Sequence, residues 1–187
     1  MQTKRLVLVS PAKWTDQNDT KFLAAYQARK PAPSLLALCL TSAPETAHHW
    51  SSFAHGTDGV RIELDRQAVE EAAARVGVTC KEVDYIELHE VAEAARQTER
   101  LPFLKRFPYR DEKEVRLLFE TGEMNIETFG LPIPAECIQR VVLGPALPAG
   151  LVEPVRRTIK AIRGFHNLPV YPTTVRENAE WINSART

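Results

Sequence analysis

The residues with the clearest chemical potential are two glutamates and an arginine at alternate positions. Glu112, Glu114 and Arg116 would share one face of a β-strand, because side chains two residues apart on a strand point the same way. Two carboxylates beside a guanidinium could bind and polarise a ligand; the carboxylates would raise one pKa and the arginine would lower it. The same spacing also fits a solvated strand face with a cross-strand ion pair, so both interpretations stay open.

A second group of polar and aromatic residues follows an apolar run. Its adjacent histidines would face different sides of a helix, and neither has a cysteine or acidic partner at zinc-like spacing, which argues against a metal site. A Ser-His-Asp hydrolase is also disfavoured, because the sequence has no Gly-x-Ser-x-Gly motif. Trp50 is expected to pack into the core. The group consists of Thr41, Ser42, His48, His49, Trp50 and Ser51.

A third group is a row of cationic residues in a predicted helix over 151–162. Arg156, Lys160 and Arg163 would lie along one helical face. Cations near a helix C-terminus are favoured by the helix dipole, so a solvated face is the ordinary interpretation. A phosphate or nucleic-acid contact is the alternative, although no glycine-rich phosphate loop is present.

An α+β arrangement is expected to position these groups. Helices are predicted to begin at Asp19, at Ser42 through a capping box with Glu45, and at Asp65, and to cover 87–97 and 151–162. A turn at 120–123 predicts a hairpin between 114–120 and 124–129. Apolar runs and alternation predict strands over 5–10, 34–41, 60–65, 78–85, 114–120, 138–144 and 168–175. We therefore predict one α+β domain spanning 1–187, with a mixed or antiparallel sheet of six to seven strands and three to five flanking helices.

Composition limits the classes of protein this chain can belong to. The 24 Lys and Arg residues balance 24 Asp and Glu residues, which argues against coating nucleic acid or an anionic membrane by bulk charge, although a local basic patch stays open. No apolar run reaches the roughly 18 residues of a membrane span, and the N-terminal run is too short for a signal-peptide core. The odd, separated Cys39, Cys80 and Cys137 predict buried free thiols in a cytoplasmic protein.

Several segments match a known pattern in the same order. Residues 50–65 are similar to Trp-Ser-x-Tyr-Ala…Gly-Val-x-Ile-x-Phe-Asp, and residues 105–116 to Lys…Trp-x-x-Glu-x-Glu-Trp-Arg. On these segments the chain resembles domain-of-unknown-function family 2971, found in bacteria and phages. Phe53, Tyr109 and Val115 depart from its aromatic pattern. We expect that the upstream strand usual in that family is absent here.

The order of these features is also distantly similar to that of ADP-ribosyltransferase toxins, which implies NAD as a substrate. A carboxylate would stabilise the oxocarbenium-like charge that develops as the glycosidic bond of NAD breaks. This resemblance implies that Glu114 has that role and that Glu112 orients the acceptor. The implied ligand-binding residues are Arg116, Trp50, Ser51, Ser42, Thr41, Tyr109 and Arg5.

Two functions are therefore expected from the sequence. One is an ADP-ribosyltransferase-like enzyme of a toxin or phage-defence system, and the other is a non-catalytic module of the same fold that binds a small molecule, a nucleotide or a protein. Nucleic acid stays open as a partner, and no membrane contact is expected. An open cleft lined by Glu112, Glu114 and Arg116 would favour the enzyme, whereas burial of these residues against a helix would favour the module.

Overall fold

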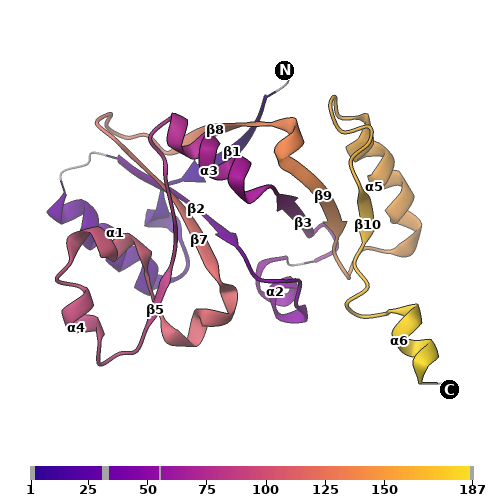
Figure 1. Ribbon diagram of the computed structural model, residues 1–187, viewed down its shortest axis with the longest axis horizontal. Coiled ribbons are helices and arrows are strands. Elements are labelled where there is room, and N and C mark those ends of the chain that lie inside the picture. Colours follow the sequence, from indigo (N-terminus) through magenta and orange to yellow (C-terminus); the bar gives the residue numbers. More distant parts are fainter. Residues whose placement is uncertain (1–2, 31–33, 55, 186–187) are drawn as a thin grey trace. The chain divides into compact units, whose positions relative to one another are not determined.

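The computed structural model describes residues 3–30, 34–54 and 56–185 and confirms the α+β class (Figure 1). The described strands pair into sheets of five, three and two strands, where the sequence predicted one sheet of six to seven. The chain divides into two compact units, which are treated separately below. The larger unit comprises 5–43 and 70–133, and the smaller unit comprises 1–4, 44–69 and 134–187.

The larger unit is built on a five-stranded sheet of order β4-β7-β2-β1-β8. β2 (Ser34–Thr41) runs antiparallel to β7 (Glu114–Thr121) over the full length of both strands. The nearly continuous apolar sequence of β2 suits a central strand covered on both faces. The remaining strands are β1 (Thr3–Val9), β4 (Thr79–Glu82) and β8 (Thr128–Pro134).

The predicted hairpin after β7 is wrong. β7 lies between β2 and β4, so both of its edges are already paired. β8 instead pairs with β1 at the opposite edge of the sheet. The predicted strand over 78–85 is also divided: β4 pairs with β7, and the Val83 amide still donates to the Glu114 carbonyl of β7 at 3.0 Å, but from Asp84 onward the chain pairs with a different strand. A separate parallel pair follows, formed by β5 (Asp84–Ile86) and β6 (Leu104–Arg106).

One face of the five-stranded sheet is covered by α1 (Gln17–Arg29), α4 (Val91–Ala94) and the 3-10 helix η2 (Thr98–Phe103) (Figure 1). The predicted cap of α1 is wrong by three residues, because Asp16 accepts the Asn18 amide at 2.8 Å. Asp19 therefore lies inside the first turn, where its side chain is buried. Two further 3-10 helices of this unit are η1 (Pro11–Lys13) and η3 (Phe107–Glu112).

The predicted helix over 87–97 is reduced to the single turn of α4. No side-chain hydrogen bond caps α4, and the Glu90 carboxylate instead accepts the Glu87 amide at 2.8 Å. Turns occupy most of the remaining predicted span.

The smaller unit contains a three-stranded sheet of order β10-β9-β3. β9 (Ile138–Leu143) pairs antiparallel with β3 (Val60–Leu64) and parallel with β10 (Val170–Pro172), which is an edge strand as predicted. α5 (Ala149–Ala161) packs against Phe165, Leu168 and Val170 through its apolar residues, which are Val152, Val155 and Ile159. The other elements are α2 (Ala47–Phe53), η4 (Ala135–Cys137) and α6 (Ala179–Ser184).

The start of α2 differs from the prediction of a Ser42 cap. Thr46 caps α2 by accepting the His49 amide at 3.1 Å. Glu45 cannot close a capping box, because its carboxylate accepts the Trp50 indole N–H at 2.7 Å. α3 (Arg66–Arg75), which continues from the smaller unit into the larger, begins after Asp65 as predicted.

The described cysteines form no disulfide bond, and the prediction that all three are buried is wrong. Cys137 is buried, whereas Cys39 is exposed because the second half of β2 loses its cover on one face. Among the described helices, none has the length and apolar character needed to cross a lipid bilayer.

Candidate functional site

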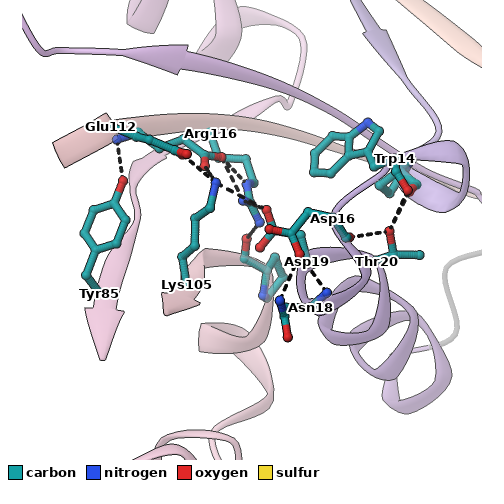
Figure 2. Close-up of polar contacts among 12 residues, drawn as sticks. Trp14, Asp16, Asn18, Asp19, Thr20, Tyr85, Lys105, Glu112 and Arg116 are labelled. Carbon is teal, nitrogen blue, oxygen red and sulfur yellow. Dashed lines mark hydrogen bonds and ion pairs between the residues drawn. The ribbon is translucent and has the colours of Figure 1, made fainter. Parts of the chain in front are cut away.

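Arg116 is the centre of a charged cluster inside the larger unit. Its side chain is 1% exposed and lies on β7 with Glu114, which is 4% exposed. The Arg116 Nε donates to Glu114 Oε1 at 2.7 Å, and Nη2 donates to Asp19 Oδ2 at 3.0 Å (Figure 2). Nη1 donates to the Pro102 carbonyl at 2.6 Å. This face of β7 is therefore covered by α1 and η2, and the solvated interpretation is wrong.

Lys105 on β6 supplies the second cation. Its Nζ donates to Glu112 Oε2 at 2.6 Å and to Glu114 Oε2 at 2.9 Å, and it lies 3.6 Å from Asp19 Oδ2 (Figure 2). The cluster therefore joins α1, β6, η3 and β7. We call it the ion cluster; its members are Asp19, Lys105, Glu112, Glu114 and Arg116.

Glu112 reaches the cluster by a route that the sequence pattern did not predict. It ends η3, and the next residue, Lys113, has the left-handed φ of 42°, so the strand alternation does not extend back to Glu112. Thr41 Oγ1 donates to the Glu112 carbonyl at 2.5 Å, and Ser42 Oγ donates to the Lys113 carbonyl at 3.1 Å. These hydroxyls therefore hold the backbone of the turn rather than the carboxylate of Glu114.

Aromatic side chains complete the surroundings of both cations. The Trp14 ring lies 5.5 Å from Arg116 Cζ, and the Tyr109 ring lies 5.2 Å from Lys105 Nζ, both within cation–π range. The Tyr85 hydroxyl accepts the Glu114 backbone amide at 2.8 Å. Of the predicted ligand-binding residues, Thr41, Ser42, Tyr109 and Arg116 thus lie at or beside the ion cluster.

The two buried carboxylates have opposite pKa shifts. Burial raises the pKa of Asp19 above its ordinary value, and this effect outweighs Arg116 and Lys105. Burial also acts to raise the pKa of Glu114, but Arg116 and Lys105 outweigh it and lower the pKa. Burial disfavours the charged forms of Lys105 and Arg116, yet the neighbouring carboxylates raise the pKa of both. Glu114 is therefore ionised at neutral pH between two cations.

The space beside the ion cluster is small. A cavity of about 20 Å³ lies between α1 and β6, next to Asp19 and Lys105. That volume is close to what one water molecule needs. Arg106 also lines this cavity, and its buried Nε has no hydrogen-bond partner among the described residues. Nor, in the described ranges, are three or more His, Cys, Asp or Glu side chains grouped so that they could hold a metal ion.

Three predicted ligand-binding residues are not part of the ion cluster. Arg5 is exposed on β1, and its side chain lies across Gly130 of β8, on the side of β1 away from β2 and β7. Trp50 and Ser51 belong to the smaller unit. There the Trp50 indole is buried and bonded to Glu45, which fits the predicted packing role, and Ser51 Oγ donates to the His48 carbonyl at 2.8 Å.

Sequence reasoning missed Asp19 as a member of the site and named Lys105 only within the family resemblance. A signal for Asp19 existed, because Leu23 and Tyr26 follow it by four and seven residues and all three are buried. An acidic residue on the apolar stripe of a helix needs a buried cation. Lys105 and Tyr85 carried no comparable local signal.

Comparison of the chain with protein-family models, curated proteins and solved structures gave no match. The resemblance to family 2971 and to ADP-ribosyltransferases therefore stays a prediction. The function is argued below from the geometry of the chain itself.

Proposed function

We propose that this chain is a non-catalytic binding module whose ion cluster holds the larger unit together. The observation that carries this proposal is that both carboxylate oxygens of Glu114 already accept hydrogen bonds from cationic side chains. Its two carboxylate oxygens already accept from Arg116 and Lys105 at 2.7 and 2.9 Å, and its side chain is 4% exposed. A glutamate that stabilises charge on a ribose must present its carboxylate to the substrate. Here that would require breaking two buried, charged contacts.

The ion cluster is well placed to fix the architecture of the larger unit. Asp19 and Arg116 are 97 residues apart in sequence, and Arg116 also binds the Pro102 carbonyl of η2. Removing one partner from such a buried network leaves an uncompensated charge, which typically costs about 3–5 kcal/mol. A rigid unit of this kind supports a binding surface without any turnover.

The second candidate is an ADP-ribosyltransferase-like enzyme of a toxin or phage-defence system that uses NAD. Glu112 is the observation that favours it, because its side chain is 16% exposed and lies beside Lys105, whose cation faces the exposed Tyr109 ring. Glu112 is thus the more accessible carboxylate of the Glu-x-Glu pair. Any NAD chemistry would depend on it more than on Glu114.

Nicotinamide release from NAD distinguishes the two candidates. Wild type, Glu112→Gln and the control Glu177→Gln, an exposed glutamate of the smaller unit, are incubated with NAD and the products are separated by chromatography. We expect no nicotinamide release from any of them. Turnover by wild type and by the control that falls about a hundredfold in a folded Glu112→Gln protein would overturn the binding-module proposal.

A further inference from the structure

The second half of α5 and the segment after it are free of acidic residues. Between Glu153 and Glu177 the sequence contains no Asp or Glu. The same stretch holds five basic residues, which are Arg156, Arg157, Lys160, Arg163 and Arg176. In a chain whose formal net charge is zero, this is a local concentration of positive charge.

Three of these cations are exposed and follow one another at spacings of three residues. Arg157 and Lys160 lie on α5, and Arg163 follows directly after its C-cap. Arg157 and Lys160 are neighbours on the helix, separated by a rise of about 4.5 Å along its axis, whereas the extended C-cap Ile162 places Arg163 beyond the helix. In the described part of the chain, none of the three forms an ion pair or side-chain hydrogen bond. Arg156, by contrast, is paired with Glu153 and donates to the Val170 carbonyl at 2.9 Å.

Lys4 adds a fourth positive charge to this surface. Its Nζ lies 4.7 Å from the centre of the Phe165 ring, two residues after Arg163. Phe165 is itself buried in the core beneath α5, so its position is fixed by packing. We call this surface the basic row; its members are Lys4, Arg157, Lys160 and Arg163.

We infer that the basic row binds the phosphodiester backbone of a nucleic acid. The inference rests on the proposed function, because it names the partner class of the binding module. Exposed cations without ion pairs, in a stretch that contains no acidic residue, match a polymer that carries a negative charge on every nucleotide. A membrane surface fits less well, since the apolar residues Val152, Val155 and Ile159 of α5, which would have to enter lipid, are packed against the core of the smaller unit.

The helix dipole does not account for the basic row. It favours cations only within the last turn, yet Arg157 lies a full turn before the end of α5, and Lys4 comes from a different segment of the chain. Contacts to phosphates also carry no sequence information, so binding is expected to be salt-dependent and insensitive to base sequence.

Fluorescence anisotropy with labelled oligonucleotides tests the inference. The probes are a mixed-sequence single-stranded RNA and a duplex DNA of equal length, each titrated at several salt concentrations. The variant Arg157→Gln/Lys160→Gln/Arg163→Gln is expected to bind at least about tenfold more weakly at low salt and to reduce the salt slope by roughly one for each cation removed. The control variant Lys21→Gln/Arg96→Gln/Lys113→Gln removes the same charge from exposed residues of the larger unit and is expected to bind like wild type.

Several results would overturn the inference. They are an absence of oligonucleotide binding by wild type, equal loss of affinity in both triple variants, and binding to phosphatidylserine vesicles but not to either oligonucleotide. Circular dichroism checks that the variants are folded, and the single variant Lys160→Gln, with a smaller expected loss, replaces the triple variant if that one is unfolded. NAD turnover is measured on the same samples. Nicotinamide release would count against the proposed function only. A lack of oligonucleotide binding without nicotinamide release would count against this inference only.

Discussion

Asp19 and Glu114 share two cationic partners, yet their pKa values shift in opposite directions. Glu114 accepts from Arg116 and Lys105 at 2.7 and 2.9 Å, whereas the corresponding distances from Asp19 are 3.0 and 3.6 Å. The negative charge of Glu114 also raises the pKa of Asp19. The shorter contacts of Glu114 with the two cations, together with the negative neighbours of Asp19, account for the opposite directions of the two pKa shifts.

Glu114→Gln is expected to lower the free energy of unfolding by about 3–5 kcal/mol at neutral pH, because it leaves Arg116 and Lys105 short of one carboxylate. The folded pKa of Glu114 lies below its ordinary value of 4.5, so its stabilisation is present above that value and disappears as the pH falls through the folded pKa. Urea unfolding of wild type and Glu114→Gln from about pH 7 to about pH 3 measures how the difference in their free energies of unfolding depends on pH. A difference between wild type and variant that stays constant over this range would contradict the assignment.

Asp19→Asn is expected to have the opposite pH dependence. Because the folded pKa of Asp19 is raised above 3.8, its contribution to stability is fully present below that value and is lost as the pH rises through the folded pKa. The substitution should therefore cost less at neutral pH than Glu114→Gln does. The same urea titrations compare the two variants, and a larger loss for Asp19→Asn at neutral pH would show that its pairing with Arg116 outweighs its burial.

At the scale of elements, packing around α2 and β9 organises the smaller unit. The Gly144 amide at the end of β9 donates to the Gly59 carbonyl at 2.8 Å, and a Cβ at Gly144 would lie 3.4 Å from the Trp50 ring. Glu45 fixes the other side of this ring through the indole N–H. Trp50 therefore joins α2 to the sheet, as the sequence predicted.

Trp50→Ala tests this junction. The Trp50 side chain is 6% exposed, so its truncation should cost about 3–5 kcal/mol of stability and give a poorly folded protein. Trp181→Ala is the matched control. Trp181 on α6 is 81% exposed, so this variant should unfold at the same temperature as wild type. Thermal unfolding followed by circular dichroism compares them. Equal melting temperatures for the two variants would refute the packing role.

Gly144→Ala tests the close approach of two backbones. A Cβ at position 144 would lie 2.7 Å from the Gly59 carbonyl oxygen, which is backbone and cannot rotate away. We expect a loss of about 1–3 kcal/mol in the free energy of unfolding, in the range of other overpacked sites. Gly122→Ala is the control, because a Cβ there meets no atom within 4 Å. Denaturant unfolding that is unchanged for Gly144→Ala would show that the junction can relax.

Across the whole molecule the formal charges balance, but the charged residues are unevenly distributed along the chain. The formal net charge is zero, yet 154–176 carries only basic charges. The ion cluster, in contrast, neutralises most of its own charge inside the larger unit. The zero net charge therefore argues against binding by bulk attraction, although the chain keeps a local concentration of positive charge.

Salt should control nucleic-acid binding strongly even in this neutral chain. With four phosphate contacts, one for each member of the basic row, the affinity should fall about 50- to 150-fold between about 50 and 200 mM salt, since each contact contributes a slope of about −0.7 for single strands and −0.9 for duplex DNA. Anisotropy titrations at both salt concentrations give the ratio. An affinity that does not change with salt would mean that the complex does not depend on phosphate contacts.

The elements that the sequence predicts correctly are those with local signals. β2 occupies 34–41 as predicted from its apolar run, β7 begins at Glu114, and α3 begins after its Asp65 cap. These features depend on side-chain periodicity and on hydrogen bonds between residues a few positions apart, and both can be recognised from a short stretch of sequence. The neutral composition and the basic residues of α5 were likewise visible in the sequence, but the pairing of Arg156 with Glu153 was not predicted.

The pairing of the strands and the burial of the charged residues, in contrast, depend on contacts between distant parts of the chain. β8 joins β1 rather than β7, and Arg116 finds its carboxylate partner Asp19 at a separation of 97 residues. The period-two pattern of Glu114 and Arg116 is the same on a solvated face and on a face covered by α1 and η2. Contacts between distant segments set burial, and burial places Glu114 and Arg116 in an internal ion cluster.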